Sequence, residues 1–129
     1  MRTNFLVIFL LLFHFPSMAA VILQYHHVSS TSPKSTSITP EQFSVHLKYL
    51  QENSFNVVPL SQLVNKIKSQ QPLKDKTVAI TFDDAYLDVL TNAKPMLDKY
   101  NYPYTIFVNP DIINSNNGKK NSHYLSSEQ

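Results

Sequence analysis

The chain contains no cysteine and only one glycine, Gly118, among its 129 residues. Without cysteine it can form neither a disulfide framework nor a thiolate site, which leaves the redox compartment open. Neither GxGxxG nor GxxxxGK[ST] can be written with a single glycine, so a phosphate-binding glycine-rich loop is excluded. The net charge is only +2 and the lysines are scattered, so no nucleic-acid partner is expected.

An apolar segment opens the chain. A basic residue precedes an unbroken apolar run over residues 5–13, and the small residues Ser17 and Ala19 then flank a cleavage position before Ala20. This order is typical of a signal peptide, so we predict a cleaved leader over residues 1–19 and a secreted or periplasmic protein. The alternative is a membrane anchor, but a span needs about 20 apolar residues and this run is shorter. No stable membrane span is expected after cleavage.

The rest of the chain, residues 20–129, is long enough for one domain at most, and a hydrophobic fraction of 43% is ordinary for a globular protein. Short apolar runs alternate with helical patterns in it. The alternation predicts an α/β fold with parallel strands and helices outside them. The predicted strands cover residues 21–25, 55–58, 77–82 and 104–108, and one helix lies between each strand and the next.

The first predicted helix has a defined start and a defined apolar face. Thr39 and Gln42 form a capping-box pattern with a proline at the first helical position. Phe43, Leu47 and Leu50 follow at the spacing of one helix face, so they are predicted to be buried.

Two further helices are predicted from apolar spacing. One begins at Ser61 as its cap, and Leu63, Val64 and Ile67 recur in it at helical spacing. The other runs to Tyr100 and contains Pro95, which should either begin its regular part or kink it.

The stretch TVAITFDDAY, residues 77–86, organises the rest of the chain. Its continuous apolar run predicts a strand buried on both faces of a parallel sheet. The strand ends on the adjacent carboxylates of Asp83 and Asp84, at the edge where parallel α/β folds place their chemistry. These acids are therefore the candidate catalytic groups. The alternative is that one caps the following helix while the other is solvated.

The residues TFDDAY, with NAKPMLDKYNYPYTIFV after them, resemble the first motif of the NodB-type polysaccharide deacetylases, carbohydrate esterase family four. That motif is a strand ending in T-F-D-D and usually followed by glycine, where this chain has Ala85. QYHHV at residues 24–28 and TPEQF from residue 39 are similar to the branch that acts on poly-N-acetylglucosamine. The resemblance implies a distorted (β/α) barrel of about seven strands, of which this chain would be the N-terminal part.

The resemblance also implies a reaction, the metal-dependent hydrolysis of N-acetyl groups on an N-acetylglucosamine polysaccharide. In it Asp83 is the general base and Asp84 is a ligand of a divalent metal, with zinc favoured and cobalt or nickel as alternatives. A metal supplies an activated water and polarises the carbonyl, while a free carboxylate takes the proton. His26 and His27 are expected at the same edge of the sheet and would line the sugar cleft. The alternative for them is a structural, hydrogen-bonded histidine, because adjacent strand residues point in different directions.

The remaining site motifs of the family are missing from this chain. The two histidines of an H-(S/T)-x-x-H motif would complete the metal site, but His123 is the only histidine after the acidic pair. The last residues, 126–129, have a capping-box pattern with no helix body after it. We therefore expect a truncated chain that is inactive alone. A naturally short protein is the alternative.

Two other functions stay open. One is a secreted, non-enzymatic product of the same ancestry that binds glycan or has no independent function. The other is a phosphohydrolase with an aspartate nucleophile, which usually needs D-x-D after its strand, whereas Asp83 and Asp84 are adjacent.

Overall fold

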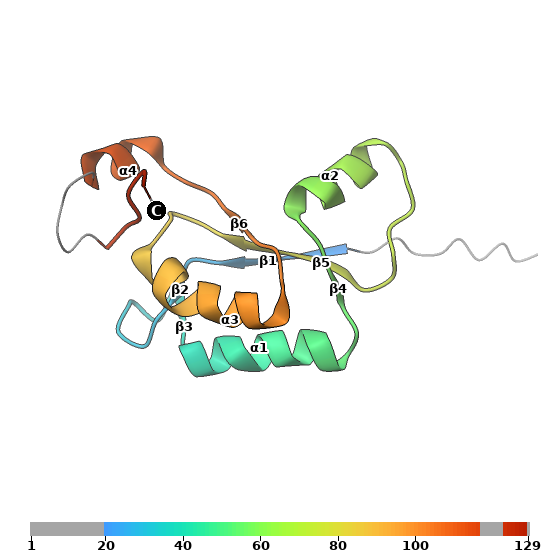
Figure 1. Cartoon of the computed structure of the whole chain (residues 1–129), viewed down its shortest axis with the longest axis horizontal. Helices are drawn as coiled ribbons and strands as arrows, with labels where there is room; N and C mark the ends of the chain where they lie inside the picture. Colours follow the sequence, from blue (N-terminus) through green and yellow to red (C-terminus); the bar gives the residue numbers. More distant parts are fainter. Residues whose placement is uncertain (1–19, 117–122, 129) are drawn as a thin grey trace, which may run out of the picture.

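The computed structural model describes residues 20–116 and 123–128. The predicted leader over residues 1–19 lies outside this part, as does Gln129 at the predicted capping box. Figure 1 shows a central sheet with helices on both of its faces. Within the described residues, no helix is both long and apolar enough to cross a membrane.

The sheet is built around β5 (Thr77–Phe82), which pairs along its whole length with β1 (Ala20–Tyr25). The other edge of β5 is shared by two short strands. β4 (Asn56–Val57) pairs with its start and β6 (Thr105–Ile106) with its end. All these pairings are parallel, so the predicted α/β alternation with parallel strands is confirmed.

The helices and a small second sheet surround these strands. α1 and α3 lie on one side of the sheet in Figure 1 and α2 on the other, with α4 beyond its end. Two-residue strands β2 and β3 pair with each other just past the carboxyl end of β1. The bounds are β2 (His27–Val28), β3 (Ser37–Ile38), α1 (Pro40–Glu52), α2 (Leu60–Lys68), the π-helix η1 (Val89–Ala93), α3 (Lys94–Tyr100) and α4 (Pro110–Asn116).

The start of α1 is the predicted capping box. The backbone N–H of Gln42 donates to Thr39 Oγ1 at 3.2 Å, and the backbone N–H of Thr39 donates to Gln42 Oε1 at 3.2 Å. Phe43, Leu47 and Leu50 are all buried, as the helical spacing predicts. The sequence therefore fixes both the register and the buried face of this helix.

Every residue of β5 is buried, which confirms a strand covered on both faces. Val78, Ile80 and Phe82 belong to the larger core cluster, together with side chains of α1 and α3. Ala79 points to the opposite face and packs with Leu63 of α2 in a second, smaller cluster. The central strand thus holds the two helix layers together.

The start of α2 corrects one prediction. Pro59, not Ser61, occupies the N-cap position, and its carbonyl accepts hydrogen bonds from the first turn of the helix. The helix begins earlier because the fixed φ of proline already suits a chain entering a helix. Of the apolar residues at helical spacing in α2, Leu63 is buried whereas Ile67 is 56% exposed.

The segment after β5 is not one continuous α-helix. Its first part is η1, in which the Lys94 N–H donates to the Val89 carbonyl five residues earlier. The regular helix α3 then begins with Pro95 in its first turn, one of the two outcomes predicted for this proline. β6 is shorter than the predicted strand, although the Phe107 N–H still donates to the Phe82 carbonyl at 2.8 Å.

Candidate functional site

The acidic pair leaves β5 through a tight turn with a left-handed backbone. Asp84 has φ 66° and Ala85 has φ 52°. Aspartate is among the non-glycine residues that tolerate this region, whereas alanine is not. Ala85 is also fully buried. The turn therefore places an alanine in a backbone conformation that glycine adopts without steric cost.

We predict that two substitutions at this turn change the free energy of unfolding by different amounts. Ala85→Val should lower the free energy of unfolding by about 2–3 kcal/mol, because a β-branched side chain disfavours positive φ and overpacks a buried site. Ala85→Gly should stay within about 1 kcal/mol of the parent, since relieved strain offsets the lost methyl burial. Urea denaturation followed by circular dichroism measures both, and a valine variant as stable as the parent would contradict the assignment.

Asp83 lies close to a side chain of β1 and to the side chain of the residue that follows β1. Gln24 Nε2 donates a hydrogen bond to Asp83 Oδ2, and His26 Nε2 lies 3.8 Å from the same oxygen. The Asp83 backbone N–H donates to the Tyr25 carbonyl at 2.9 Å, which continues the β1–β5 ladder. The Asp83 side chain is 24% exposed. It is thus a partly buried carboxylate that is held in place and still open to solvent.

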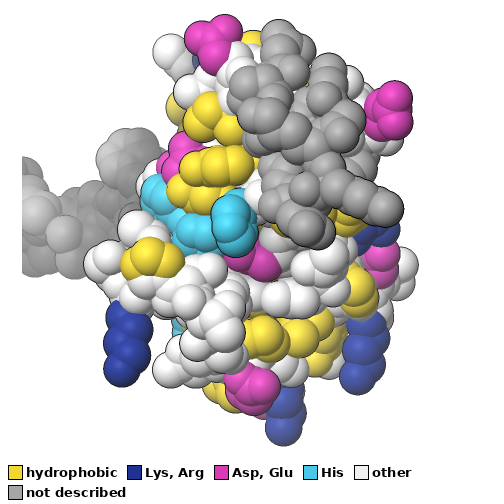
Figure 2. Space-filling model, turned by 90° about the vertical axis from the view of Figure 1, so that its left-hand side faces the viewer, with side chains coloured by type: hydrophobic (Ala, Val, Ile, Leu, Met, Phe, Trp, Pro, Cys, Tyr) yellow, Lys and Arg dark blue, Asp and Glu magenta, His cyan; other side chains and the backbone are white. Residues whose placement is uncertain are grey.

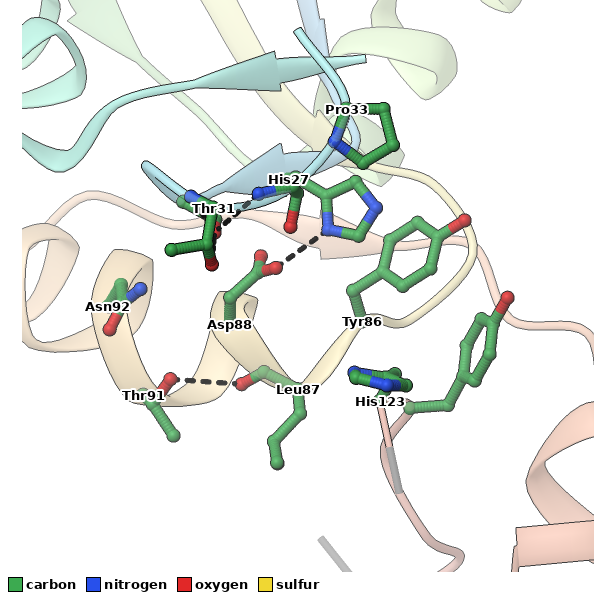
Figure 3. A pocket seen from close by; sticks show the side chains of 12 residues that line it. His27, Thr31, Pro33, Tyr86, Leu87, Asp88, Thr91, Asn92 and His123 are labelled. Carbon is green, nitrogen blue, oxygen red and sulfur yellow. Dashed lines mark hydrogen bonds and ion pairs between the residues drawn. The ribbon is translucent and has the colours of Figure 1, made fainter. Parts of the chain in front are cut away.

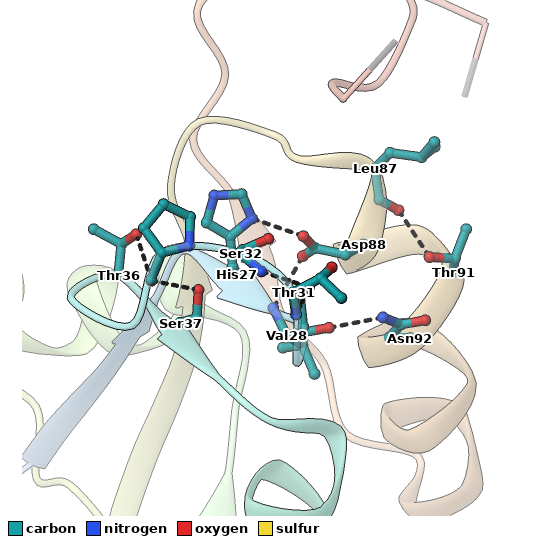
Figure 4. Close-up of polar contacts among 12 residues, drawn as sticks. His27, Val28, Thr31, Ser32, Thr36, Ser37, Leu87, Asp88, Thr91 and Asn92 are labelled. Atoms are coloured by element: carbon teal, nitrogen blue, oxygen red, sulfur yellow. Dashed lines mark hydrogen bonds and ion pairs between the residues drawn. The ribbon is translucent and has the colours of Figure 1, made fainter. Parts of the chain in front are cut away.

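His27 points away from Asp83 and toward η1. Its Nδ1 lies 2.7 Å from Asp88 Oδ2, and the other oxygen of Asp88 accepts the Val28 N–H at 2.9 Å. Asn92 Nδ2 donates to the Val28 carbonyl at 2.8 Å (Figure 4). Asp88 and Asn92 therefore hold β2 against η1 at two positions. The side chains of His26 and His27 therefore lie in different environments, as the alternation of strand residues predicts. Only His26 is close to Asp83.

Asp88 is the site residue that the sequence analysis did not single out. Its carboxylate reaches back over 61 residues to the His27 ring, and it is largely shielded, with 17% of its side chain exposed. A third acid within TFDDAYLD was the available signal. Its partner could not be read from the sequence, because the contact depends on how β2 docks against η1.

We predict that Asp88→Ala costs about 1–3 kcal/mol of unfolding free energy, because it leaves the buried Val28 N–H without its acceptor and His27 without its partner. The matched control is Asp98→Ala. Asp98 pairs with Lys94 at the exposed surface of α3, so its loss should cost less than about 0.5 kcal/mol. Equal urea midpoints for the two variants would show that the His27–Asp88 contact does not stabilise the fold.

Tyr86 joins this cluster to the last described segment of the chain. Its ring stacks on His27 with centroids 3.6 Å apart and on Tyr124 with centroids 4.8 Å apart. Tyr86 and Tyr124 also form an antiparallel backbone bridge, and the Leu125 N–H donates to the Ala85 carbonyl at 2.8 Å. Hydrogen bonding to Tyr124, burial and the nearby Asp84 charge raise the pKa of Tyr86 to about 12.

A pocket of about 590 Å³ opens beside this aromatic stack. Polar groups from the 29–33 loop and from η1 line one side of it, and the stacked rings line the other (Figure 3). Figure 2 shows this end of the molecule, where histidine side chains lie next to acidic and apolar ones. A pocket that combines aromatic faces with hydroxyl, amide and carboxylate groups suits a polar ligand with apolar ring faces.

The described residues do not form a complete metal site. Among residues 20–116 and 123–128, no three histidine, aspartate or glutamate side chains come together in a way that could hold an ion. Asp84 can supply one carboxylate, whereas a zinc site normally takes three or more protein ligands. The residues present therefore do not fit the whole metal centre that the sequence resemblance implies.

Comparisons of the sequence and of the structure with known proteins both find deacetylases. Residues 70–126 match the family model described as polysaccharide deacetylase. The Bacillus subtilis protein YxkH is 33% identical over 84% of this chain, and a Staphylococcus aureus protein named poly-beta-1,6-N-acetyl-D-glucosamine N-deacetylase is 31% identical over 83% of it. The solved structure of IcaB from Ammonifex degensii superposes with a TM-score of 0.69 at 29% identity and covers 84% of this chain.

These relatives are much longer than the chain. It spans 36% of the Bacillus subtilis protein, 40% of the Staphylococcus aureus protein and 44% of the solved IcaB chain. The structural neighbours are deacetylases with the (β/α) barrel fold, and the parallel sheet described above corresponds to part of that barrel. The matched residues, the shared fold and the acidic pair after β5 make this chain similar to part of a polysaccharide deacetylase domain.

Proposed function

We propose that this chain supplies the acidic part of the active site of a polysaccharide N-deacetylase, a hydrolase that cleaves the carbon–nitrogen bond of N-acetyl groups on an N-acetylglucosamine polymer. The observation that carries the proposal is Asp83, a partly exposed carboxylate held by Gln24 beside His26 at the carboxyl end of β5. The substrate class is supported by the names of the staphylococcal relatives.

In this proposal Asp83 is the general base. A general base must be fixed within reach of the proton that it takes and must remain accessible to the reacting water. Gln24 and His26 both approach Oδ2, and no contact to Oδ1 is found in the described part of the chain. Oδ1 is therefore the oxygen that we assign to proton transfer.

Asp84 is proposed as one ligand of a divalent metal, with zinc favoured and cobalt or nickel as alternatives. When bound, such a metal would polarise the acetyl carbonyl and activate water. The further ligands have to come from outside the described residues, since one carboxylate does not hold zinc. In the family the sequence resembles, they are two histidines that this chain lacks, so we propose that the chain alone does not turn over substrate.

The pocket beside Tyr86 is proposed as the place where sugar units of the polymer lie. His27, held by Asp88, is one of its walls, and the neighbouring His26 lies 3.8 Å from Asp83. The same pocket supports the alternative function, a glycan-binding protein without catalysis. Binding of N-acetylglucosamine oligomers by the chain, without acetate release even when the missing ligands are supplied, would favour that alternative.

The protein is also proposed to act outside the cytoplasm after loss of its leader. We predict that the exported chain begins at Ala20, because the small residues before it follow a short apolar run. Mass spectrometry of exported protein checks this. Material that retains Met1 in the membrane fraction would contradict it.

The proposed function is tested with a chimaera. Residues 20–128 are joined to the part of the Bacillus subtilis relative that lies outside its match to this chain. The chimaera should release acetate from an N-acetylglucosamine oligomer when zinc or cobalt is added, and a metal chelator should stop the release. A folded, metal-binding chimaera that releases no acetate would refute the proposed reaction.

A further inference from the structure

The ring of His27 is held from two directions at the wall of the pocket beside Tyr86. Its Nδ1 lies 2.7 Å from Asp88 Oδ2, and its face stacks on the Tyr86 ring with the centroids 3.6 Å apart. Its backbone N–H donates to the Thr36 carbonyl at 3.1 Å, beside the β2–β3 pairing. Only 12% of the side chain is exposed. The imidazole is therefore held in one orientation.

The contact with Asp88 also decides which nitrogen of the ring carries the proton. Asp88 Oδ1 accepts the Val28 N–H at 2.9 Å, which leaves Oδ2 for His27. A carboxylate only accepts hydrogen bonds, so the nitrogen that faces it, Nδ1, has to be the donor. In a neutral imidazole the other nitrogen, Nε2, is then an acceptor.

Nε2 of His27 has no hydrogen-bond or ion-pair partner within the described part of the chain. Figure 3 shows Nδ1 turned to Asp88 and the other nitrogen on the opposite side of the ring, toward Pro33. An aspartate–histidine pair activates a serine nucleophile only when the serine hydroxyl bonds to Nε2. The Ser29 hydroxyl at this pocket instead contacts Thr31 Oγ1 at 3.2 Å. Nε2 is therefore left to a bound molecule.

The pocket around Nε2 suits a molecule that donates hydrogen bonds. Donors of its wall are already engaged with the backbone. Thr91 Oγ1 donates to the Leu87 carbonyl at 3.3 Å. Asn92 Nδ2 donates to the Val28 carbonyl at 2.8 Å. Among the described residues that line the pocket there is no lysine or arginine, so an anionic group would lack a cationic partner. A neutral sugar, by contrast, brings hydroxyl and amide donors.

We propose that His27 Nε2 accepts a hydrogen bond from a hydroxyl or amide N–H of a bound sugar unit, and that Asp88 is the positioning residue that keeps Nε2 unprotonated. The proposal rests on the proposed function for the nature of the ligand. It makes His27 a specificity-determining residue of the pocket. A ligand that has no donor at this point leaves a largely buried acceptor unpaired and is therefore disfavoured.

Asp88→Asn should reverse the hydrogen-bonding character of Nε2 with little change of shape. The amide oxygen has to stay with the Val28 N–H, so the amide nitrogen faces His27 and donates to Nδ1. The ring proton then moves to Nε2. We expect sugar binding to weaken about 2–10-fold, which is the contribution of one neutral hydrogen bond. The matched control is Asp98→Asn on the exposed surface of α3, which should leave binding unchanged.

The test is nuclear magnetic resonance of the full chain, isotope-labelled at its histidine nitrogens, at about pH 8, where an ordinary imidazole is neutral. The His27 resonances are those that disappear in His27→Gln. We expect a protonated Nδ1 and an unprotonated Nε2 in the free chain. An N-acetylglucosamine oligomer should shift the Nε2 resonance upfield and leave Nδ1 nearly unmoved. His46 is the internal control, because it lies in an apolar groove between β1 and α1 and should not respond.

Each part of the inference can fail separately. A protonated Nε2 in the free chain, or an unprotonated one in Asp88→Asn, would overturn the role of Asp88. An Nε2 resonance unmoved by about 10 mM oligomer, enough to fill a site with a Kd of about 1 mM, would overturn the sugar contact. Acetate release by the chimaera together with an unmoved Nε2 would overturn this inference alone. A shifted Nε2 with no acetate release by the chimaera would refute deacetylation and leave the sugar contact standing.

Discussion

Asparagine in place of Asp83 is expected to lower acetate release by the chimaera about 10²–10⁴-fold, the usual contribution of a general base. The amide has nearly the shape of the carboxylate and can still accept a hydrogen bond from Gln24, so the fold should be unchanged. Metal binding should also be retained, because the proposed ligand is Asp84. Turnover is measured as acetate released from an N-acetylglucosamine oligomer, alongside a metal titration.

Two further variants make this result specific. Asp84→Ala should lose both turnover and metal, since it removes a proposed ligand. Asp75→Asn should lose neither, because Asp75 is an exposed loop residue whose carboxylate accepts only the Lys76 N–H among the described contacts. Equal losses of metal in the Asp83 and Asp84 variants would contradict the division of roles between the two acids.

Phe43→Ala is expected to have the largest effect on stability, a loss of about 3–5 kcal/mol in the free energy of unfolding. Its side chain is fully buried, and its ring contacts Tyr25 edge-on at 5.1 Å and Phe82 at 6.0 Å between centroids. Removing it leaves a cavity where α1 meets β1 and β5. Val45→Ala, on the exposed flank of the same helix, should cost less than about 0.5 kcal/mol. Urea denaturation would contradict this packing if the two variants lost similar stability.

The features that could be predicted from the sequence are local ones. The capping box of α1 needs only Thr39 and Gln42, which are three residues apart. The buried strand β5 and the acids that follow it are likewise contiguous. Because parallel strands end at one edge, the meeting of His26 with Asp83 also followed from two local predictions and a general rule.

The features that were missed depend on contacts between distant segments. Asp88 binds His27 across 61 residues, and Tyr124 stacks on Tyr86 from the other end of the chain. No periodicity in the sequence marks such pairs. The exposure of Ile67 could not be predicted either, because helical spacing identifies an apolar face and not how much of that face the sheet covers.

The apolar groove between β1 and α1 also depends on contacts between distant segments. Val45 and Tyr49 stand on the apolar flank of a helix whose buried face was predicted correctly, yet their exposure becomes visible only once β1 is in place.

The central claim is that this chain supplies the two acids of a deacetylase active site, Asp83 and Asp84, but not the remaining metal ligands. The most direct measurement is acetate release from an N-acetylglucosamine oligomer by the purified full chain, with zinc or cobalt added, before and after Asp83→Asn. We predict no acetate release by the chain in either form, and release that depends on Asp83 in the chimaera. Turnover by the chain alone that survives Asp83→Asn would contradict both the incompleteness of the site and the role of Asp83.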